Sequence, residues 1–189
     1  RTGFLLAEWT IGLVGFGRIG RTVARYLSSF RPRIVVCDPF LQQRDIPEGV
    51  ELRELAVLLA KSDLVSLHVS RDRDLGVLIG RNELAMMKRG SYLVNTARGF
   101  LVDEAALYDA IMRGHLAGAA LDVFGDEPYT GPLATLPQVL CTPHVATLTK
   151  ASRAAMEYQC AKRVVEHFQP QDAAVGTAAG RVTVTQGAK

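Results

Sequence analysis

The sequence contains little of what marks several classes of protein. It has three cysteines, at positions 37, 141 and 160, an odd number without a Cys-x-x-Cys pair, so neither a disulfide framework nor a metal-binding pattern is expected. A net charge of +3 without any run of five Lys or Arg residues argues against a nucleic-acid partner. No apolar segment approaches the roughly 18 residues that span a membrane, so no membrane partner is expected either.

The first ten residues, RTGFLLAEWT, also lack the basic region, long apolar stretch and cleavage site of a secretion signal. We therefore expect a reducing, cytoplasmic setting. The composition is otherwise that of an ordinary globular protein, with 48% hydrophobic and 22% charged residues over 189 positions. That length fits one domain, at most two small ones, and allows a substantial core.

Short apolar runs alternate with helical patterns along the chain. The runs resemble strands that are buried on both faces of a parallel sheet, and they cover 10–15, 33–38, 63–69, 91–97, 117–124 and 138–142. Helical spacing is present in 18–29, 53–60, 103–114 and 150–168. This alternation predicts an α/β fold with a Rossmann-type doubly wound parallel sheet.

Helix ends, helix faces and domain limits can also be predicted. Asp103 is a plausible N-cap and Gly114 a stop signal for the third helix. In the first helix one apolar face is expected to contain Ile19, Val23, Tyr26 and Leu27. The composition predicts a linker over 1–9, the sheet domain over 10–168, and a mobile C-terminal tail over 169–189 that includes a short strand in one interpretation.

A Gly-x-Gly-x-x-Gly pattern follows the first strand and opens the first helix. Gly15 permits a tight turn, Gly17 lets a pyrophosphate approach the backbone, and Gly20 brings helix and strand close together. Asp38 ends the next strand, where a carboxylate can accept hydrogen bonds from ribose hydroxyls and repels a 2′-phosphate. The pattern favours NAD over NADP; the alternative is a tight turn beside a surface aspartate.

Four motifs stand in order along the chain: GFGRIG (15–20), YLVNTARGFLVDEAAL (92–107), LDVFGDEP (121–128) and TPHVATLT (142–149). With them, residues 2–168 resemble the cofactor domain of the D-isomer-specific 2-hydroxyacid dehydrogenases, the family of phosphoglycerate dehydrogenases and glyoxylate/hydroxypyruvate reductases. The resemblance implies NAD as cofactor and a small 2-hydroxy or 2-keto acid as substrate.

The resemblance also implies a catalytic trio of Arg98, Glu127 and His144. A guanidinium can hold a substrate carboxylate through two parallel hydrogen bonds. Histidine suits the exchange of the hydroxyl proton near neutral pH, and a carboxylate neighbour would orient the ring and favour its protonated form. Each residue also has a structural alternative: Arg98 could form a surface ion pair, Glu127 could be a solvated loop residue, and His144 could be a core side chain.

Further cofactor contacts follow from the same resemblance. Arg18 and Ile19 would lie on the pyrophosphate loop, and Asp122 would bind the carboxamide. His68 and Val69 are expected near the adenosine, and Thr96, Ala97 and Ala146 along the nicotinamide pocket, together with Arg98 and His144. A structural role remains an equal alternative for His68.

The sequence departs from the family pattern in two respects. After the fourth strand, where Leu-His-x-Pro-Leu-Thr is usual, the chain has Ser70 and Asp72, and a carboxylate near phosphate repels it unless Arg71 or Arg73 compensates. The second departure is the substrate domain, which we expect to be absent, so the chain should bind NAD(H) yet turn over substrate poorly or not at all.

Several questions stay open at this level. Family members pair through the cofactor domain, which predicts a homodimer, but part of the usual pairing arm would precede residue 1, so a monomer is the alternative. Two other functions compete with the dehydrogenase: an NAD(H)-sensing or corepressor-like regulatory module, and a decayed domain that binds no nucleotide. The sequence does not identify the acid.

Overall fold

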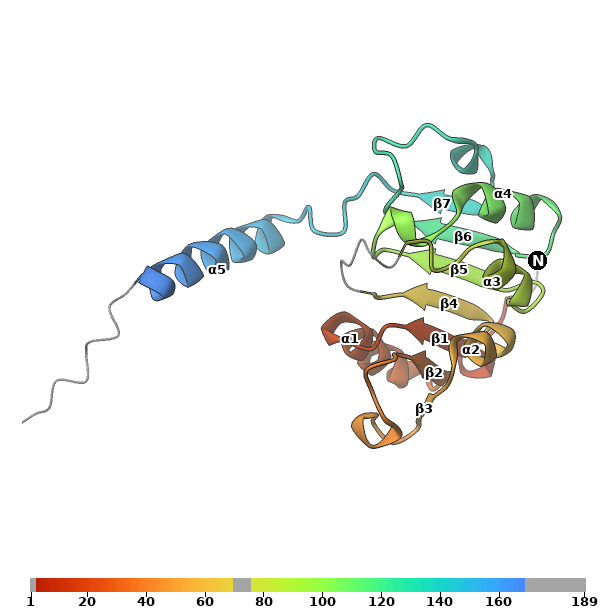
Figure 1. The fold of residues 1–189 in the computed structure, drawn as a ribbon, viewed down its shortest axis with the longest axis horizontal. Coiled ribbons are helices and arrows are strands. Elements are labelled where there is room, and N and C mark those ends of the chain that lie inside the picture. Colours follow the sequence, from red (N-terminus) through yellow and green to blue (C-terminus); the bar gives the residue numbers. More distant parts are fainter. Residues whose placement is uncertain (1–2, 70–75, 169–189) are drawn as a thin grey trace, which may run out of the picture. The chain divides into compact units, whose positions relative to one another are not determined.

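An all-parallel sheet organises the first part of the chain in the computed structural model, which describes residues 3–69 and 76–168 (Figure 1). In these residues the spatial strand order is β3-β2-β1-β4-β5-β6-β7. The strands are β1 Thr10–Val14, β2 Arg33–Cys37, β3 Val50–Leu52, β4 Leu64–Leu67, β5 Tyr92–Asn95, β6 Gly118–Leu121 and β7 Val139–Cys141. The order reverses between β1 and β4, which confirms the predicted doubly wound sheet and creates the crevice where such sheets bind ligands.

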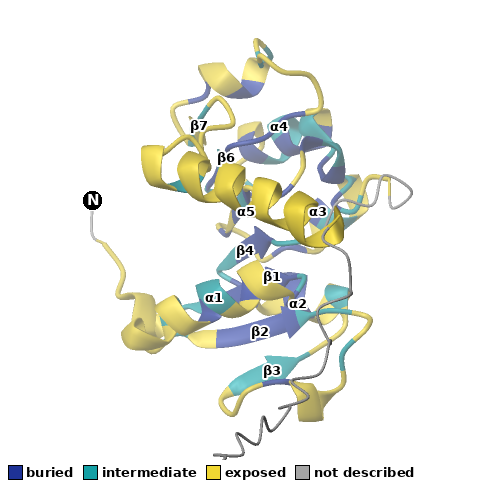
Figure 2. Cartoon of the chain, turned by 90° about the vertical axis from the view of Figure 1, so that its left-hand side faces the viewer, coloured by how far each residue is buried: buried dark blue, intermediate teal, exposed yellow. Residues whose placement is uncertain are grey.

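Helices cover this sheet on both faces. These helices are α1 Arg18–Leu27, α2 Leu55–Lys61, α3 Arg81–Met86 and α4 Glu104–Met112. A fifth helix, α5 Lys150–Phe168, belongs to a second unit and is described separately. Alternate residues of β1 point to opposite sides, so that Ile11 and Leu13 pack toward α1, whereas Val14 joins the larger core beneath α2, α3 and α4. Figure 2 shows β1 and β2 as buried, in agreement with continuous apolar runs.

The predicted face of α1 is partly wrong. Ile19 and Tyr26 are each 65% exposed, whereas Gly20 and Ala24 are buried. At Gly20 the helix packs tightly against the turn that follows β1, because an added Cβ would lie 2.4 Å from the carbonyl oxygen of Gly15. The stripe that faces the sheet therefore starts at this glycine, and the two larger apolar residues lie beside it.

The predicted ends of α4 are confirmed. The Asp103 side chain accepts a hydrogen bond from the amide of Ala106 at 2.9 Å, and Gly114 has a φ of 64°, which suits a residue that ends a helix. All six predicted strands are present, each shorter than expected, whereas β3 and α3 were not predicted.

The chain divides into two compact units, one over residues 1–146 and one that begins at Thr147. The second unit contains α5, which is confirmed as a helix and has no buried residue. Whether α5 belongs to one domain over 10–168 stays a prediction, and the predicted tail, 169–189, lies outside the described residues. In the part of the chain that the structure describes, no helix combines the length and apolarity needed to cross a membrane.

Candidate active site

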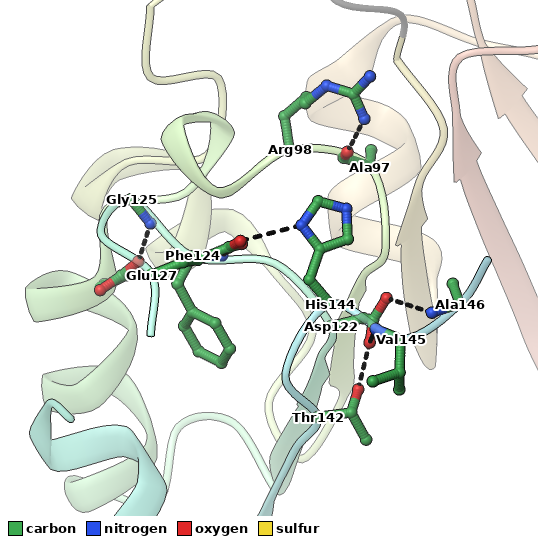
Figure 3. A network of polar contacts seen from close by, with 11 residues as sticks. Ala97, Arg98, Asp122, Phe124, Gly125, Glu127, Thr142, His144, Val145 and Ala146 are labelled. Carbon is green, nitrogen blue, oxygen red and sulfur yellow. Dashed lines mark hydrogen bonds and ion pairs between the residues drawn. The ribbon is translucent and has the colours of Figure 1, made fainter. Parts of the chain in front are cut away.

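Three consecutive strands bring the predicted catalytic trio to one edge of the sheet. Arg98 follows β5, Glu127 follows β6 and His144 follows β7, and parallel strands place their carboxyl ends at the same edge. The three side chains line one cavity of about 410 Å³, together with Phe100 and Phe124. Figure 3 shows Arg98, Glu127 and His144 with their hydrogen bonds. The cavity thus combines a cation, an acid–base pair and an apolar wall.

His144 and Glu127 form the acid–base pair. Nδ1 of the imidazole lies 2.9 Å from Oε2 of Glu127, while Oε1 of that carboxylate accepts the amide of Phe124 at 3.0 Å. The hydrogen bond from His144, helped by the Phe124 amide, lowers the pKa of Glu127 below its ordinary value. An ionised carboxylate only accepts, so Nδ1 carries a hydrogen and Nε2 is the nitrogen that can exchange a proton with a substrate.

The backbone of His144 is held in an uncommon conformation. Its φ is 53°, in the left-handed region that few non-glycine residues adopt. The buried Asp122 carboxylate secures this turn, because Oδ1 accepts the Val145 amide at 2.9 Å and the Thr142 hydroxyl at 2.6 Å, while Oδ2 accepts the Ala146 amide at 3.1 Å. Asp122 therefore fixes the direction in which the imidazole leaves the chain, a role that the sequence did not predict.

These bonds also set the ionisation of Asp122. Burial by itself would raise the pKa of the carboxyl, but the hydrogen bonds from Thr142, Val145 and Ala146, with the charge of His144, lower it below its ordinary value. The carboxylate is thus ionised at neutral pH and can accept hydrogen bonds from all three of these donors. Oδ2 accepts from one protein donor among the described residues. It can therefore accept a second hydrogen bond, such as the expected one from the carboxamide of nicotinamide.

Replacing Asp122 by asparagine should lower the free energy of unfolding at pH 7 by about 2 kcal/mol, because a charged acceptor is lost and an NH₂ group meets an N–H donor. A depressed native pKa stabilises the fold above the unfolded pKa, and that contribution is lost as pH falls through the native value. The difference between the two proteins should therefore shrink below about pH 4. Denaturant unfolding at neutral pH and near pH 3 measures it, and a difference that grows on acidification would contradict this role.

Arg98 lies on a loop that is held by Asn95, a residue that was not predicted. Asn95, at the buried end of β5, accepts the Ala97 amide at 3.0 Å and donates to the carbonyl oxygen of Arg98 at 2.9 Å. The guanidinium donates to the carbonyl of Ala97 at 2.6 Å and is otherwise exposed. A polar residue ending an apolar strand was the available signal for Asn95.

The next residue, Gly99, joins this loop to the one that bears Glu127. An added Cβ at Gly99 would lie 1.9 Å from the carbonyl carbon of Phe124, so only glycine allows the two backbones to touch. Glu104 accepts the Gly125 amide at 2.7 Å and holds the same loop from α4. The sequence does not predict either contact, because both depend on how two distant loops meet.

The glycine loop has the form that a dinucleotide requires. Gly15 has a φ of 89°, and Gly20 has no space for a side chain. Gly17 differs from both, because its φ is −75° and an added Cβ would have no neighbour within 4 Å. Neither conformation nor packing requires glycine there, so the open backbone at the N-terminus of α1 fits an approaching pyrophosphate.

Asp38 lies beside this loop at the end of β2. Its Oδ2 accepts the Phe16 amide at 2.9 Å, and its Oδ1 accepts the Phe40 amide at 3.0 Å. The carboxylate is therefore fixed and only half-buried, at the position where a ribose hydroxyl would be recognised. Together, the loop and this carboxylate fit the adenosine and phosphate parts of NAD.

The remaining predicted cofactor contacts occupy the same edge of the sheet. Thr96, Ala146 and the first α1 residues, Arg18 and Ile19, are exposed, whereas Ala97 is buried. His68 and Val69 follow β4 and are half-buried; the pKa of His68 is lowered by burial, and its Nε2 lies 3.0 Å from the Ser66 hydroxyl. That bond supports the structural alternative for His68.

The predicted departures at Ser70 and Asp72 lie outside the described residues, as do Arg71 and Arg73. Within 3–69 and 76–168, no cluster of three or more His, Cys, Asp or Glu side chains could hold a metal ion.

A family model matches the chain over residues 1–146. It describes the D-isomer specific 2-hydroxyacid dehydrogenase, NAD binding domain. Among curated proteins, the chain is similar to D-3-phosphoglycerate dehydrogenase of Mycobacterium bovis, with 46% identity over 142 residues, 74% of this chain and 27% of the relative.

Solved structures agree with this match. A glyoxylate reductase from Paecilomyes thermophila superposes with a TM-score of 0.84 at 33% identity, covering 90% of this chain and 52% of the other. The D-lactate dehydrogenase from Aquifex aeolicus, complexed with NAD and lactic acid, gives 0.79 at 33% identity, covering 88% and 55%. The chain therefore spans between about a quarter and half of the length of these relatives.

Proposed function

Because the chain belongs to the D-isomer specific 2-hydroxyacid dehydrogenase family through its NAD-binding domain, we propose that it serves hydride transfer between nicotinamide and C2 of a D-2-hydroxy or 2-keto acid. The observation that carries this proposal is the cavity that joins Arg98 to the His144–Glu127 pair at the carboxyl edge of the sheet. A glycine loop suited to pyrophosphate lies at the same edge.

The chemistry divides among these side chains. Bound NAD would supply the hydride acceptor for C2, and bound NADH the hydride donor for the reverse reaction. Arg98 binds and orients the substrate carboxylate by charge-assisted hydrogen bonds. Nε2 of His144 removes the hydroxyl proton during oxidation and returns it during reduction, while Glu127 holds the ring by Nδ1 and stabilises its positive charge.

The cavity also explains why a second part of the enzyme would matter. The His144 and Glu127 side chains are 49% and 39% exposed, so water reaches the acid–base pair in this chain. A domain that closes over the cavity would exclude that water and strengthen each charged contact. We therefore propose that residues 1–189 on their own bind NAD(H) but transfer hydride slowly.

Replacing Asp38 by serine should weaken NADH binding about tenfold and narrow the preference over NADPH, because the carboxylate that accepts ribose hydroxyls and repels a 2′-phosphate is lost. Serine can still accept the Phe40 amide, which keeps the turn formed. Fluorescence titrations of both proteins with NADH and NADPH measure the two affinities. An unchanged ratio between them would contradict a role for Asp38 in cofactor choice.

Hydride transfer from NADH to a panel of 2-keto acids tests the proposed reaction. The complete gene product should consume NADH with at least one acid, and this chain should do so far more slowly. NADH binding without transfer to any acid by the complete product would instead favour the regulatory module, for which the reported relatives, all named as dehydrogenases or reductases, give no support.

A further inference from the structure

A second hollow, the α3–α4 groove, lies between α3 and α4, away from the catalytic cavity. Its volume is about 390 Å³, and three of its lining residues are Arg81, Arg89 and Arg113. Arg89 precedes β5 and His115 precedes β6, so the hollow extends toward the amino ends of strands whose carboxyl ends form the active site. The proposed dehydrogenase reaction uses none of these residues.

The charges in this groove are unbalanced. Arg81 donates to Oδ2 of Asp109 at 3.0 Å, and a nitrogen of Arg113 lies 4.0 Å from the same oxygen. Arg89 has no ion-pair partner among the described residues. The groove is thus lined by three guanidinium groups and one carboxylate, which gives a net charge of +2 before any contribution from His115.

The groove has room for a ligand, and a hydrogen bond holds its two sides together. Three of its lining residues, Ala85, Ala106 and Ala110, have small side chains that take up little of the space beside the arginines. Nε2 of His115 lies 3.1 Å from the carbonyl oxygen of Leu84, to which only a protonated nitrogen can donate. This hydrogen bond therefore ties α3 to the segment that follows α4.

We propose that the α3–α4 groove is a second binding site, specific for small phosphate-bearing anions. A guanidinium presents parallel N–H donors that match phosphate oxygens, and an anion carrying two charges would balance the groove. Arg89 and Arg113 bind it directly, and Asp109 competes with it for Arg81 and Arg113. This site is independent of the proposed reaction and of the glycine loop.

Inorganic phosphate is the probe, added to the whole chain at constant ionic strength while amide resonances are followed by NMR. Saturable shifts are expected at residues 81–89 and 109–115, separable from any at the glycine loop. Arg113→Gln should weaken this binding at least about tenfold, since bonds to a charged ligand are lost. The control Arg25→Gln, on α1, should leave it unchanged.

Asp109→Asn provides the sharper test, because it removes a competing carboxylate and should tighten phosphate binding several-fold. The matched control Glu48→Gln changes the net charge equally at an exposed site and should have no effect. Shifts that do not saturate, that chloride reproduces, or that both charge variants change equally would overturn the proposal. Failure here would leave NADH binding untouched, so it is distinguishable from failure of the proposed function.

Discussion

Turnover of the complete gene product should fall by about 10²–10⁴ when His144 is replaced by alanine, the range that a positioned acid–base group supplies. The variant has no side chain that can exchange the hydroxyl proton, whereas the glycine loop and Asp38 are unchanged. NADH affinity should therefore stay nearly the same. Steady-state rates and a fluorescence titration of the same samples separate the two effects.

A matched variant, His144→Asn, separates the proton from the backbone. The turn needs a positive φ at this position, and asparagine adopts that conformation more readily than most residues but does not exchange a proton near neutral pH. It should lose turnover as alanine does while keeping the fold. A His144→Asn protein with wild-type rates would contradict the proposed role of the imidazole.

Replacing Gly17 by aspartate should weaken NADH binding by at least about 100-fold, because like charges about 4 Å apart near a protein surface repel by roughly 4 kcal/mol. The same change should leave the fold intact. Gly17 is the N-cap of α1, has a negative φ and leaves an added Cβ without neighbours, and aspartate is a favoured N-cap residue. Fluorescence titration and a thermal melt of the same variant measure both quantities.

Gly17→Ser is the control for size. Serine also caps a helix but carries no charge, so it should keep an unchanged melting temperature and lose less affinity than aspartate. Equal NADH affinities for wild type and Gly17→Asp would mean that the phosphates lie elsewhere. A variant that fails to fold would contradict the open surroundings of this residue.

Much of the fold could be predicted because the relevant signals are local. The strands of the sheet core are continuous apolar runs, and α4 has a visible cap and stop at Asp103 and Gly114. β3 has three residues and α3 has six, too few for a period to emerge. In α1 the spacing alone misassigned Ile19 and Tyr26, because the helix packs through Gly20 and Ala24 instead.

The candidate site could also be predicted only in part from the sequence. Motifs indicated Arg98, Glu127 and His144, and the structure brings them to one cavity. The anchoring of the histidine turn by Asp122 was not predictable, since its hydrogen bonds join the loop after β6 to the loop after β7. Contacts between loops far apart in sequence depend on the assembled sheet, and no spacing rule encodes them.

The central claim is that a dinucleotide binds along the carboxyl edge of this sheet with its phosphates at the Gly15–Gly20 loop. Calorimetric titration of the folded chain with NADH tests it most directly. The predicted result is a saturating heat with one site per chain that disappears in Gly17→Asp. No heat with correctly folded protein at millimolar NADH, or equal heat from the variant, would contradict it.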